Sequence, residues 1–419
     1  MKVKDIIKLG IYKTFLVPIN WMLSLVLSFL QKKHNNKTMV YSVMPPASTG
    51  MAPFALKIFN KRKNDFLIVN KFNNPFEYLY AIFYGHSLNT NIFDISFDKY
   101  LMKNFKIQKK IFVIGNSPHH NETLKKAIET KGEENRYLYL GENLLFTPAL
   151  NYLNAWKKEA MEETISKYYN KNLEVTFKED LNIFWTKNNI YGLKIIKELT
   201  GINKFIVFNE NAKDLFAKEF TSEELADIKI NTINPPVEDL TTIPPAPQFA
   251  SRDYVLIGSF GLPQKLKSTP DIIETINLLN KNGTKTKLLL AGYSVKEYLN
   301  TLSINKENII AYDSPSEKKL LSLMKSVDIA IQLRPKNQGE TSGCISELLG
   351  LKQKIITTKG FVTNGLEKYC INVDPYITPE NLAKVITENL NNYKKIKDND
   401  DIFNHYSFLC AANKILREI

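Results

Sequence analysis

Cysteine and histidine are scarce in this 419-residue chain, and their scarcity excludes several kinds of site. The three cysteines form no CxxC pair and have no metal-site spacing, so they are typical of reduced thiols in a cytosolic protein. The five histidines include no HExxH motif, which argues against a zinc hydrolase. No Gly-Lys-Ser/Thr follows a glycine-rich loop, which excludes a P-loop nucleotide site.

Internal repeats and low-complexity tracts are also missing, so neither a solenoid nor a long disordered tail is expected. Hydrophobic residues make up 44% and charged residues 24%, which is the balance of a globular protein. A chain of 419 residues is too long for one ordinary core. We therefore expect two domains of about 200 residues each.

Acidic residues are in deficit, with 43 Asp and Glu against 56 Lys and Arg, and the net charge is +13. A basic surface favours anionic partners, which include nucleic acids, anionic lipids and phosphorylated small molecules. The sequence contains no recognisable DNA- or RNA-binding motif. Nucleic acid is therefore the least favoured of these partners.

The basic residues concentrate at the start of the chain. Residues 1–37 hold seven lysines and one acid, and they bracket an uncharged run over residues 14–31. The run has 18 residues, close to the lower limit of roughly 17–25 for spanning a bilayer. A proline, an asparagine and two serines interrupt it, and no signal-peptide cleavage site follows. We interpret residues 1–37 as a segment that associates with the surface of anionic membranes; a spanning helix and a packed domain helix remain alternatives.

After this segment, short apolar runs alternate with helical patterns, which indicates a parallel sheet covered on both faces. An aromatic run over residues 76–84 follows Pro75 and is interpreted as a buried helix, with contact to lipid as the alternative. The first set of predicted strands covers residues 38–45, 65–72, 91–97, 110–117, 135–141 and 205–209.

A proline-rich stretch over residues 229–251 marks a domain boundary, because prolines at that density favour an extended connector. The alternation then restarts, so we expect an α/β protein with two Rossmann-like, doubly wound domains that face a cleft. The second set of predicted strands covers residues 254–260, 285–292, 308–313, 327–334, 354–358 and 369–373. The predicted divisions are residues 1–37, 38–245, 250–400 and a final helix over 401–419.

The strongest chemical signal lies in residues 327–358, where a predicted strand leads through Gly-Glu-Thr-Ser-Gly into a helix. Backbone N–H groups at a helix start form an anion site, and Thr341 or Ser342 can cap it. Gly343 allows a ligand close to the backbone, and Glu347 could accept hydrogen bonds from a ribose diol. An ordinary capped helix with solvated acids is the alternative interpretation.

A second segment, residues 258–267, also connects a predicted strand to a helix. It contains Gly261 and two lysines, Lys265 and Lys267, whose positive charges could bind an anionic group. Lysines solvated at the start of a helix are the alternative.

Polar residues follow the predicted strands of the first domain as well. Asn116, Ser117 and His120 come after one strand, and Glu142 comes after the next. An imidazole at the carboxyl end of a strand can bond substrate hydroxyls, although a structural histidine is the alternative. The loop Pro-Pro-Ala-Ser-Thr-Gly ends at Gly50, after the first predicted strand.

Together these segments resemble the retaining GT-B glycosyltransferases of the fourth glycosyltransferase family, in its subgroup with a GETSG donor loop. The resemblance is specific at Leu333-Arg334, at Gly-Glu-Thr-Ser-Gly and at the following helix. It implies that Glu340 contacts the transferred sugar and Glu347 the nucleotide ribose. These two glutamates are one residue closer together than in the family's commoner form.

The resemblance implies roles for the remaining candidates. Lys267, with Lys265 as second choice, would hold the diphosphate beside Gly261, and the loop ending at Gly50 would close over the donor phosphates. Arg334, Thr341, Ser342 and Gly343 would belong to the donor site. Asn116, Ser117, His120 and Glu142 would form the acceptor side, and the catalytic set would be Lys267, Glu340, His120 and Glu142.

The expected function is transfer of a sugar from a nucleotide sugar to a lipid-linked or glycan acceptor, with retention and without a metal cofactor. Surface polysaccharide or glycolipid synthesis, on the cytoplasmic side of the plasma membrane, fits a basic apolar segment and a cytosolic donor. A GT-B sugar-nucleotide epimerase, a non-catalytic nucleotide-sugar or glycan-binding relative, and a nucleic-acid-binding protein are the alternatives. Asp398-Asn399-Asp400 is interpreted as a solvated loop rather than a metal site.

Overall fold

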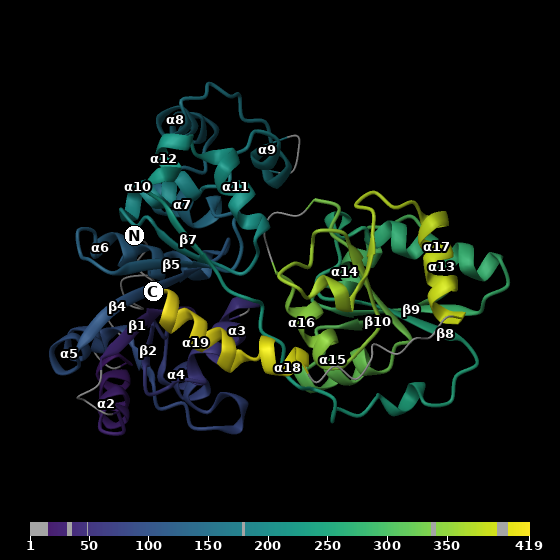
Figure 1. Ribbon diagram of the computed structural model, residues 1–419, viewed down its shortest axis with the longest axis horizontal. Helices are drawn as coiled ribbons and strands as arrows, with labels where there is room; N and C mark the ends of the chain where they lie inside the picture. Colours follow the sequence, from purple (N-terminus) through teal and green to yellow (C-terminus); the bar gives the residue numbers. More distant parts are fainter. Residues whose placement is uncertain (1–15, 32–35, 48, 178–180, 337–340, 392–400) are drawn as a thin grey trace, which may run out of the picture. The chain divides into compact units, whose positions relative to one another are not determined.

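The computed structural model consists of two compact α/β units (Figure 1). Unit 1 runs to Ile233 and also includes the last helix, whereas unit 2 runs from Asn234 to Ser407. The prediction of two Rossmann-like domains is confirmed. The residues that the structure describes are 16–31, 36–47, 49–177, 181–336, 341–391 and 401–419.

Unit 1 is built on a seven-stranded, wholly parallel sheet with the order β3-β2-β1-β4-β5-β6-β7. Most of these strands are short runs of β-branched, aromatic and other apolar residues, and β1 and β5 are buried along their whole length. The strands are β1 (Lys37–Tyr41), β2 (Phe66–Asn70), β3 (Ile92–Asp94), β4 (Ile107–Ile114), β5 (Arg136–Leu140), β6 (Lys204–Val207) and β7 (Lys229–Thr232).

Helices cover the sheet of unit 1 and share one hydrophobic core with it (Figure 1). The last helix, α19, belongs to this core, because the rings of Phe54 and Phe408 lie 5.5 Å apart and Ile415 is fully buried. The helices are α2 (Val17–Ser28), α3 (Met51–Asn60), α4 (Pro75–Ile82), α5 (Asp98–Asn104), α6 (Asn121–Glu129), α7 (Phe146–Leu153), α8 (Lys158–Tyr169), α9 (Leu181–Lys187), α10 (Leu193–Thr200), α11 (Asn211–Glu219), α12 (Ser222–Ala226) and α19 (Phe408–Glu418).

Unit 2 has a six-stranded parallel sheet with the order β10-β9-β8-β11-β12-β13. The buried hydrophobic residues of unit 2 form two separate clusters. Its strands are β8 (Val255–Phe260), β9 (Thr286–Gly292), β10 (Ile309–Asp313), β11 (Ile329–Gln332), β12 (Ile355–Thr358) and β13 (Ile371–Val373), and its helices are α13 (Thr269–Lys281), α14 (Val295–Asn300), α15 (Glu317–Lys325), α16 (Gly343–Gly350), α17 (Pro379–Asn391) and α18 (Asp401–Tyr406).

Each sheet contains a point where the strand order reverses, between β1 and β4 in unit 1 and between β8 and β11 in unit 2. Loops that leave the carboxyl ends of such neighbouring strands diverge, and ligands bind open α/β sheets in the resulting crevice. The polar segments singled out in the sequence follow these four strands or β5.

The proline-rich stretch differs from the expected connector. Its first residues form β7, which pairs with β6, and the prolines then lie with unit 2. The Val237 N–H donates to the Tyr406 carbonyl at 2.6 Å, and the Leu240 N–H donates to the Gly350 carbonyl at 3.1 Å. These bonds hold residues 234–245 and α18 on unit 2, so that only α19 of the predicted final helix lies on unit 1.

The uncharged N-terminal run forms α2, which packs on unit 1 through its polar side. Asn20, Ser24 and Ser28 are fully buried, although the sequence predicted a membrane-associating segment with these residues as interruptions. Among the described residues, no helix combines the length and apolarity needed to cross a bilayer. Residues 1–15, part of the predicted segment, lie outside the described residues.

The aromatic run over residues 76–84 was predicted to be a buried helix, and that prediction is only half right. Tyr78, Ala81 and Ile82 of α4 are buried, but the Phe76 side chain is 82% exposed and Phe83 is 58% exposed. Among the residues that the structure describes, none packs closely enough on the outer side of α4 to bury these two rings.

Candidate active site

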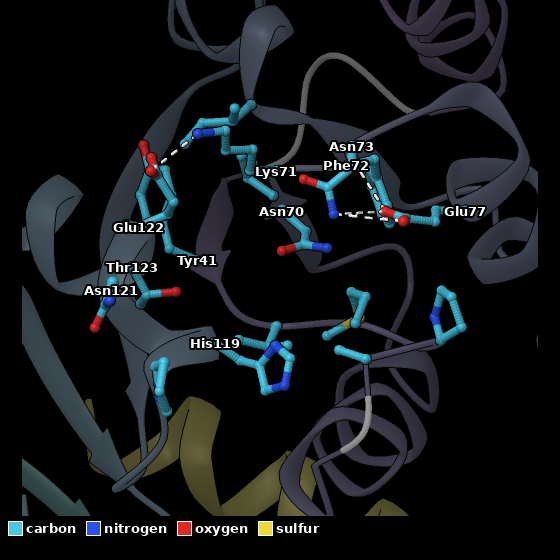
Figure 2. Close-up of a pocket in the computed structure, with 17 residues that line it drawn as sticks. Tyr41, Asn70, Lys71, Phe72, Asn73, Glu77, His119, Asn121, Glu122 and Thr123 are labelled. Atoms are coloured by element: carbon cyan, nitrogen blue, oxygen red, sulfur yellow. Dashed lines mark hydrogen bonds and ion pairs between the residues drawn. The ribbon is translucent and has the colours of Figure 1, made fainter. Parts of the chain in front are cut away.

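A cavity of about 470 Å³ lies at the carboxyl end of the unit 1 sheet, next to its reversal point. Tyr41 at the end of β1 and Asn70 at the end of β2 form part of its wall, and the first turn of α6 forms another part (Figure 2). Helix α4 contributes Glu77. The cavity therefore lies where the fold predicts a ligand site.

Two polar pairs stand on either side of this cavity (Figure 2). On one side Lys71 Nζ lies 2.9 Å from Glu122 Oε1, and both side chains are partly exposed. On the other side the Asn73 N–H donates to Glu77 Oε2 at 2.9 Å. The lining thus contains two carboxylates and one ammonium group, which gives it a negative balance.

Three further polar side chains reach the cavity without being used inside the protein. Within the described part of the chain, the Asn70 amide, the Thr123 hydroxyl and the His119 imidazole have no side-chain hydrogen-bond partner. In Figure 2 the Asn70 amide and the His119 ring point into the hollow from opposite sides. Hydrogen-bond donors and acceptors spaced around a cavity of this size suit the hydroxyl groups of a sugar.

The predicted acceptor-side residues gather at the ends of β4 and β5, which are neighbours in the sheet. The Asn116 N–H donates to Glu142 Oε1 at 2.6 Å, and Asn116 Oδ1 accepts from the Thr147 N–H at 2.8 Å. Ser117 Oγ accepts a longer bond of 3.4 Å from the His119 N–H. These contacts fix the loop after β4 against the loop after β5.

His120 is part of the same group, but it points inward. Its side chain is buried, and Nδ1 lies 3.1 Å from the Val113 carbonyl oxygen. Since a carbonyl only accepts, Nδ1 carries the proton and Nε2 is the acceptor. Burial lowers the pKa of His120 to about 4, so the ring is neutral near pH 7.

A glycine permits this packing. A Cβ built at Gly115 would lie 3.1 Å from His120 Nε2 and 3.2 Å from Glu142 Oε1, tighter than ordinary contacts. His120 does not line the cavity, whereas its neighbour His119 does. The catalytic roles of His120 and Glu142 stay predictions.

The loop that ends at Gly50 also reaches this region. Ala47 lines the cavity, and Gly50 immediately precedes α3, with open space where its Cβ would stand. Met51 packs on Gly141, where a Cβ would overlap the Met51 sulfur at 2.0 Å. The Met51 side chain therefore lies directly on the Gly141 backbone, which positions the loop beside the end of β5.

In unit 2, the loop after β8 meets the start of α16. Gly261 adopts a left-handed conformation with φ of 88°, which favours glycine. A Cβ built there would lie 3.3 Å from Lys267 Nζ and 3.4 Å from Cys344 Sγ. Lys267 thus points back over the end of β8 toward the helix, whereas Lys265 is exposed.

The start of α16 has the form predicted for an anion site. Ser342 is the N-cap residue and its Oγ accepts a 3.3 Å bond from the Ile345 N–H, while a Cβ at Gly343 would meet nothing within 4 Å. Thr341 directly precedes the cap and is half-buried. The backbone N–H groups of a helix start and its positive dipole end favour a negatively charged ligand.

Charged side chains surround the same helix start. The pKa of the Cys344 thiol is raised to about 12, first by burial and then by the charge of Glu347, while the charges of Lys267 and Arg334 act in the opposite direction. These three charged groups are therefore near one another around Cys344. The Arg334 guanidinium lies 5.4 Å from the centre of the Phe361 ring, which fixes its direction.

Some predictions fall outside what is described. Glu340 lies in residues 337–340 and Asp398-Asn399-Asp400 in residues 392–400, which the structure does not describe. Among the described residues, His, Cys, Asp and Glu side chains form no group of three that could hold a metal ion.

The sequence analysis missed the cavity residues Asn70, Lys71 and Glu122. A usable signal was present, because Asn70 and Lys71 directly follow the buried run Phe-Leu-Ile-Val, at the carboxyl end where ligands bind. Glu122 stands in the first turn of α6, two residues after His120.

No protein-family model matches the sequence, and no curated protein matches it either. Solved structures match over nearly the whole chain. HepE from Anabaena, in complex with UDP, has a TM-score of 0.58 and 10% identity, covering 91% of this chain and 98% of its own. The trehalose-6-phosphate synthase OtsA has a TM-score of 0.59 and 10% identity, with the same coverage.

A trehalose-phosphate synthase from Burkholderia xenovorans, in complex with glucose-6-phosphate, has a TM-score of 0.55 and 9% identity. It is matched over 92% of this chain and 99% of its own. The chain has the GT-B fold. At these identities the likeness extends to the fold alone.

Proposed function

We propose that this protein is a retaining glycosyltransferase of the fourth family's GETSG subgroup, which transfers a sugar from a nucleotide donor to a glycan acceptor. The observation that carries the proposal is the cluster at the start of α16. There the Lys267 ammonium, an open helix start and Glu347 surround one point at the carboxyl end of the unit 2 sheet. Cations and free N–H groups suit a diphosphate, and a carboxylate beside them suits a ribose.

On the donor side, Lys267 and the α16 N–H groups stabilise the charge that grows on the departing nucleoside diphosphate. Glu347 accepts hydrogen bonds from the ribose hydroxyls, and Arg334, Thr341, Ser342 and Gly343 complete the wall. Glu340, by the resemblance, holds the transferred sugar. This arrangement supplies positive charge from the chain itself, which supports a reaction that needs no metal.

On the acceptor side, the unit 1 cavity holds the sugar whose hydroxyl is to be glycosylated. Its carboxylates outnumber its ammonium group, so it disfavours a phosphorylated monosaccharide. One GT-B protein of similar fold was solved with glucose-6-phosphate. We propose instead a neutral glycan end. Its reacting hydroxyl would lie near the loops after β4 and β5, which hold Asn116, Ser117 and Glu142 and pack on the buried His120.

The pathway and location follow from the same proposal. A neutral sugar at the end of a lipid-linked carrier is an acceptor for surface polysaccharide or glycolipid synthesis. Its enzyme needs cytosolic nucleotide sugar and membrane contact together. Residues 1–37, with seven lysines around an apolar run, favour peripheral attachment to anionic lipid on the cytoplasmic face of the plasma membrane.

A thermal-shift screen of nucleoside diphosphates, with UDP first because HepE was solved with it, tests the donor site. We expect one nucleotide to stabilise the protein in this screen, and calorimetry then measures its dissociation constant. This constant should be at least tenfold higher in Lys267→Ala than in the wild type. Lys265→Ala should raise it less, and Lys318→Ala on α15 serves as a matched control for loss of a surface charge. Absence of nucleotide binding across the screen would overturn the proposal.

A further inference from the structure

Helix α2 has apolar side chains on its outer side as well as on its inner side. The inner side mixes buried polar residues with leucines that pack on the unit 1 core. The side chains that face away are apolar and exposed, namely Ile19, Met22 and Val26, followed by Phe29 and Leu30 just after the helix. Positions 19, 22, 26 and 29 follow helical spacing, so they form one continuous stripe. An amphipathic helix of a soluble domain normally turns this stripe toward the core.

A buried hydrogen-bond network holds α2 in this orientation. Asn20 Nδ2 donates to Asp94 Oδ2 at 3.2 Å, and the Asp94 N–H donates to Ser24 Oγ at 3.1 Å. Ser24 Oγ lies 2.8 Å from the Tyr78 hydroxyl, which itself donates to the Ile92 carbonyl at 2.8 Å. Turning the helix over would break these buried bonds, so the apolar stripe is fixed outward.

Helix α4 lies beside α2 and presents a second stripe (Figure 1). Phe76, Leu79, Tyr80 and Phe83 are exposed at helical spacing, and Tyr78 on the inner side connects α4 to Ser24. The two stripes together form what we name the α2–α4 face. Single exposed apolar residues are ordinary, but nine on two contacting elements are a marker of an interaction site.

Charge identifies the occupant of this face. The described residues of α2 carry no charge, while Lys13 stands four residues before Val17 and Lys32 and Lys33 directly follow Gln31. A second copy of this chain carries the same net charge of +13, which disfavours self-association. An anionic bilayer offers hydrocarbon for the stripe and phosphate for the lysines.

The length of α2 decides how it meets the bilayer. Its 12 residues extend about 18 Å, well short of a hydrocarbon core of about 30 Å. Its polar side is also occupied by unit 1. The helix therefore lies along the membrane surface as a part of the domain.

We infer that the α2–α4 face is a monolayer-inserting platform that seats unit 1 on anionic lipid, with the acceptor cavity beside it. Helix α4 links the two, because Phe76 and Phe83 point outward while Glu77 of the same helix lines the cavity. A lipid-linked glycan held in the membrane can then enter the cavity from its edge. This inference rests on the proposed membrane-side function and adds the surface that performs it.

Flotation of the full-length protein with vesicles of phosphatidylcholine, with and without phosphatidylglycerol, tests the platform. Phe76→Ser with Phe83→Ser should lower binding to the anionic vesicles by about tenfold, and Val26→Ser with Phe29→Ser should act similarly, because apolar area drives insertion. The matched control is Tyr376→Ser in unit 2, which removes a side chain that is 74% exposed and should change nothing. Unchanged thermal unfolding in each variant shows that the fold is kept.

If the Phe76/Phe83 variant floats with anionic vesicles as well as the wild type does, α4 is not part of the membrane-binding face. The composite face is also wrong if the Val26/Phe29 variant alone abolishes binding. Light scattering without vesicles measures the molar mass of the protein. A dimer in the wild type that the same substitutions convert to a monomer would show a second copy on the face and overturn the lipid assignment. Nucleotide affinity, measured by calorimetry, should be the same in all variants. Vesicle binding by a protein that binds no nucleotide would leave the platform standing and reject the proposed function.

Discussion

The Asn116 backbone N–H and the Glu142 carboxylate are joined by a 2.6 Å hydrogen bond across the ends of β4 and β5. The bond connects two loops that the resemblance assigns to the acceptor side. It also gives Glu142 a structural task beside any catalytic one. A substitution that removes the charge of Glu142 but keeps its hydrogen bond distinguishes the structural task from the catalytic one.

Glu142→Gln should keep most of the stability, because the amide oxygen can still accept from Asn116. Glu142→Ala should cost about 1–3 kcal/mol in the free energy of unfolding, since it leaves a partly buried N–H unpaired. Urea unfolding measures both. If the carboxylate charge also serves the reaction, kcat in Glu142→Gln falls although the protein is stable. Equal stability of the Gln and Ala variants would show that the bond contributes nothing.

Much of the fold could be predicted because parallel strands are continuous apolar runs. Every strand except β7 lies within or overlaps a predicted one, and β7 was missed because Lys-Ile-Asn-Thr stands directly before the prolines. The orientation of α2 could not be predicted. Its periodicity marks two faces, but the choice between them depends on Asp94 and Tyr78, which are remote in the sequence.

The donor side was more predictable than the acceptor side for a physical reason. A glycine turn, a helix start and their capping serine are local in sequence, so Gly261, Ser342 and Gly343 could be found by pattern. The cavity of unit 1 joins the ends of β1 and β2 to the start of α6. Only the strand order brings Asn70 near Thr123, and the strand order cannot be predicted from any short segment of the sequence.

Glu347→Ala should raise the dissociation constant of the donor nucleotide at least tenfold. A hydrogen bond to a charged group contributes about 1.5–3 kcal/mol, and Glu347 lies near Cys344 and Lys267 at the start of α16. Isothermal calorimetry with the nucleotide found in the screen is the measurement. Glu317→Ala, in the first turn of α15, is the control for removing an exposed helix-start carboxylate. An unchanged constant in Glu347→Ala would reject the ribose role.

Transfer activity should stay near its starting value in excess chelator. The proposed site neutralises the diphosphate with Lys267 and helix N–H groups, which chelation does not touch. The assay compares initial rates with and without EDTA, followed by added magnesium. Loss of activity with EDTA that magnesium restores would contradict a metal-free reaction.

Asn70→Ala should raise the KM for the glycan acceptor several-fold and leave donor affinity unchanged, because the Asn70 amide opens into the unit 1 cavity and has no other side-chain partner among the described residues. Asn305→Ala, in a loop of unit 2, is a control for loss of a surface amide. Steady-state kinetics against acceptor and calorimetry with nucleotide separate the two effects. A change in donor affinity with an unaltered acceptor KM would place the acceptor elsewhere.

The buried His120 should make the stability of unit 1 depend on pH between about 6.5 and 4. Burial lowers its pKa in the folded protein to about 4 from an ordinary value of 6.5, so in this range the unfolded chain binds a proton that the folded chain does not. Stability from the neutral ring is therefore fully present above pH 6.5 and is lost as the pH falls toward 4. The full shift corresponds to about 3 kcal/mol.

Asparagine at this position does not titrate, so the stability difference between wild type and His120→Asn should shrink by about that amount as the pH falls. Urea unfolding at several pH values measures this difference, and the carboxylates common to both proteins cancel. A difference that stays constant from pH 7 to 4 would mean that His120 titrates normally, and the inward-facing ring bonded to Val113 would then be wrong.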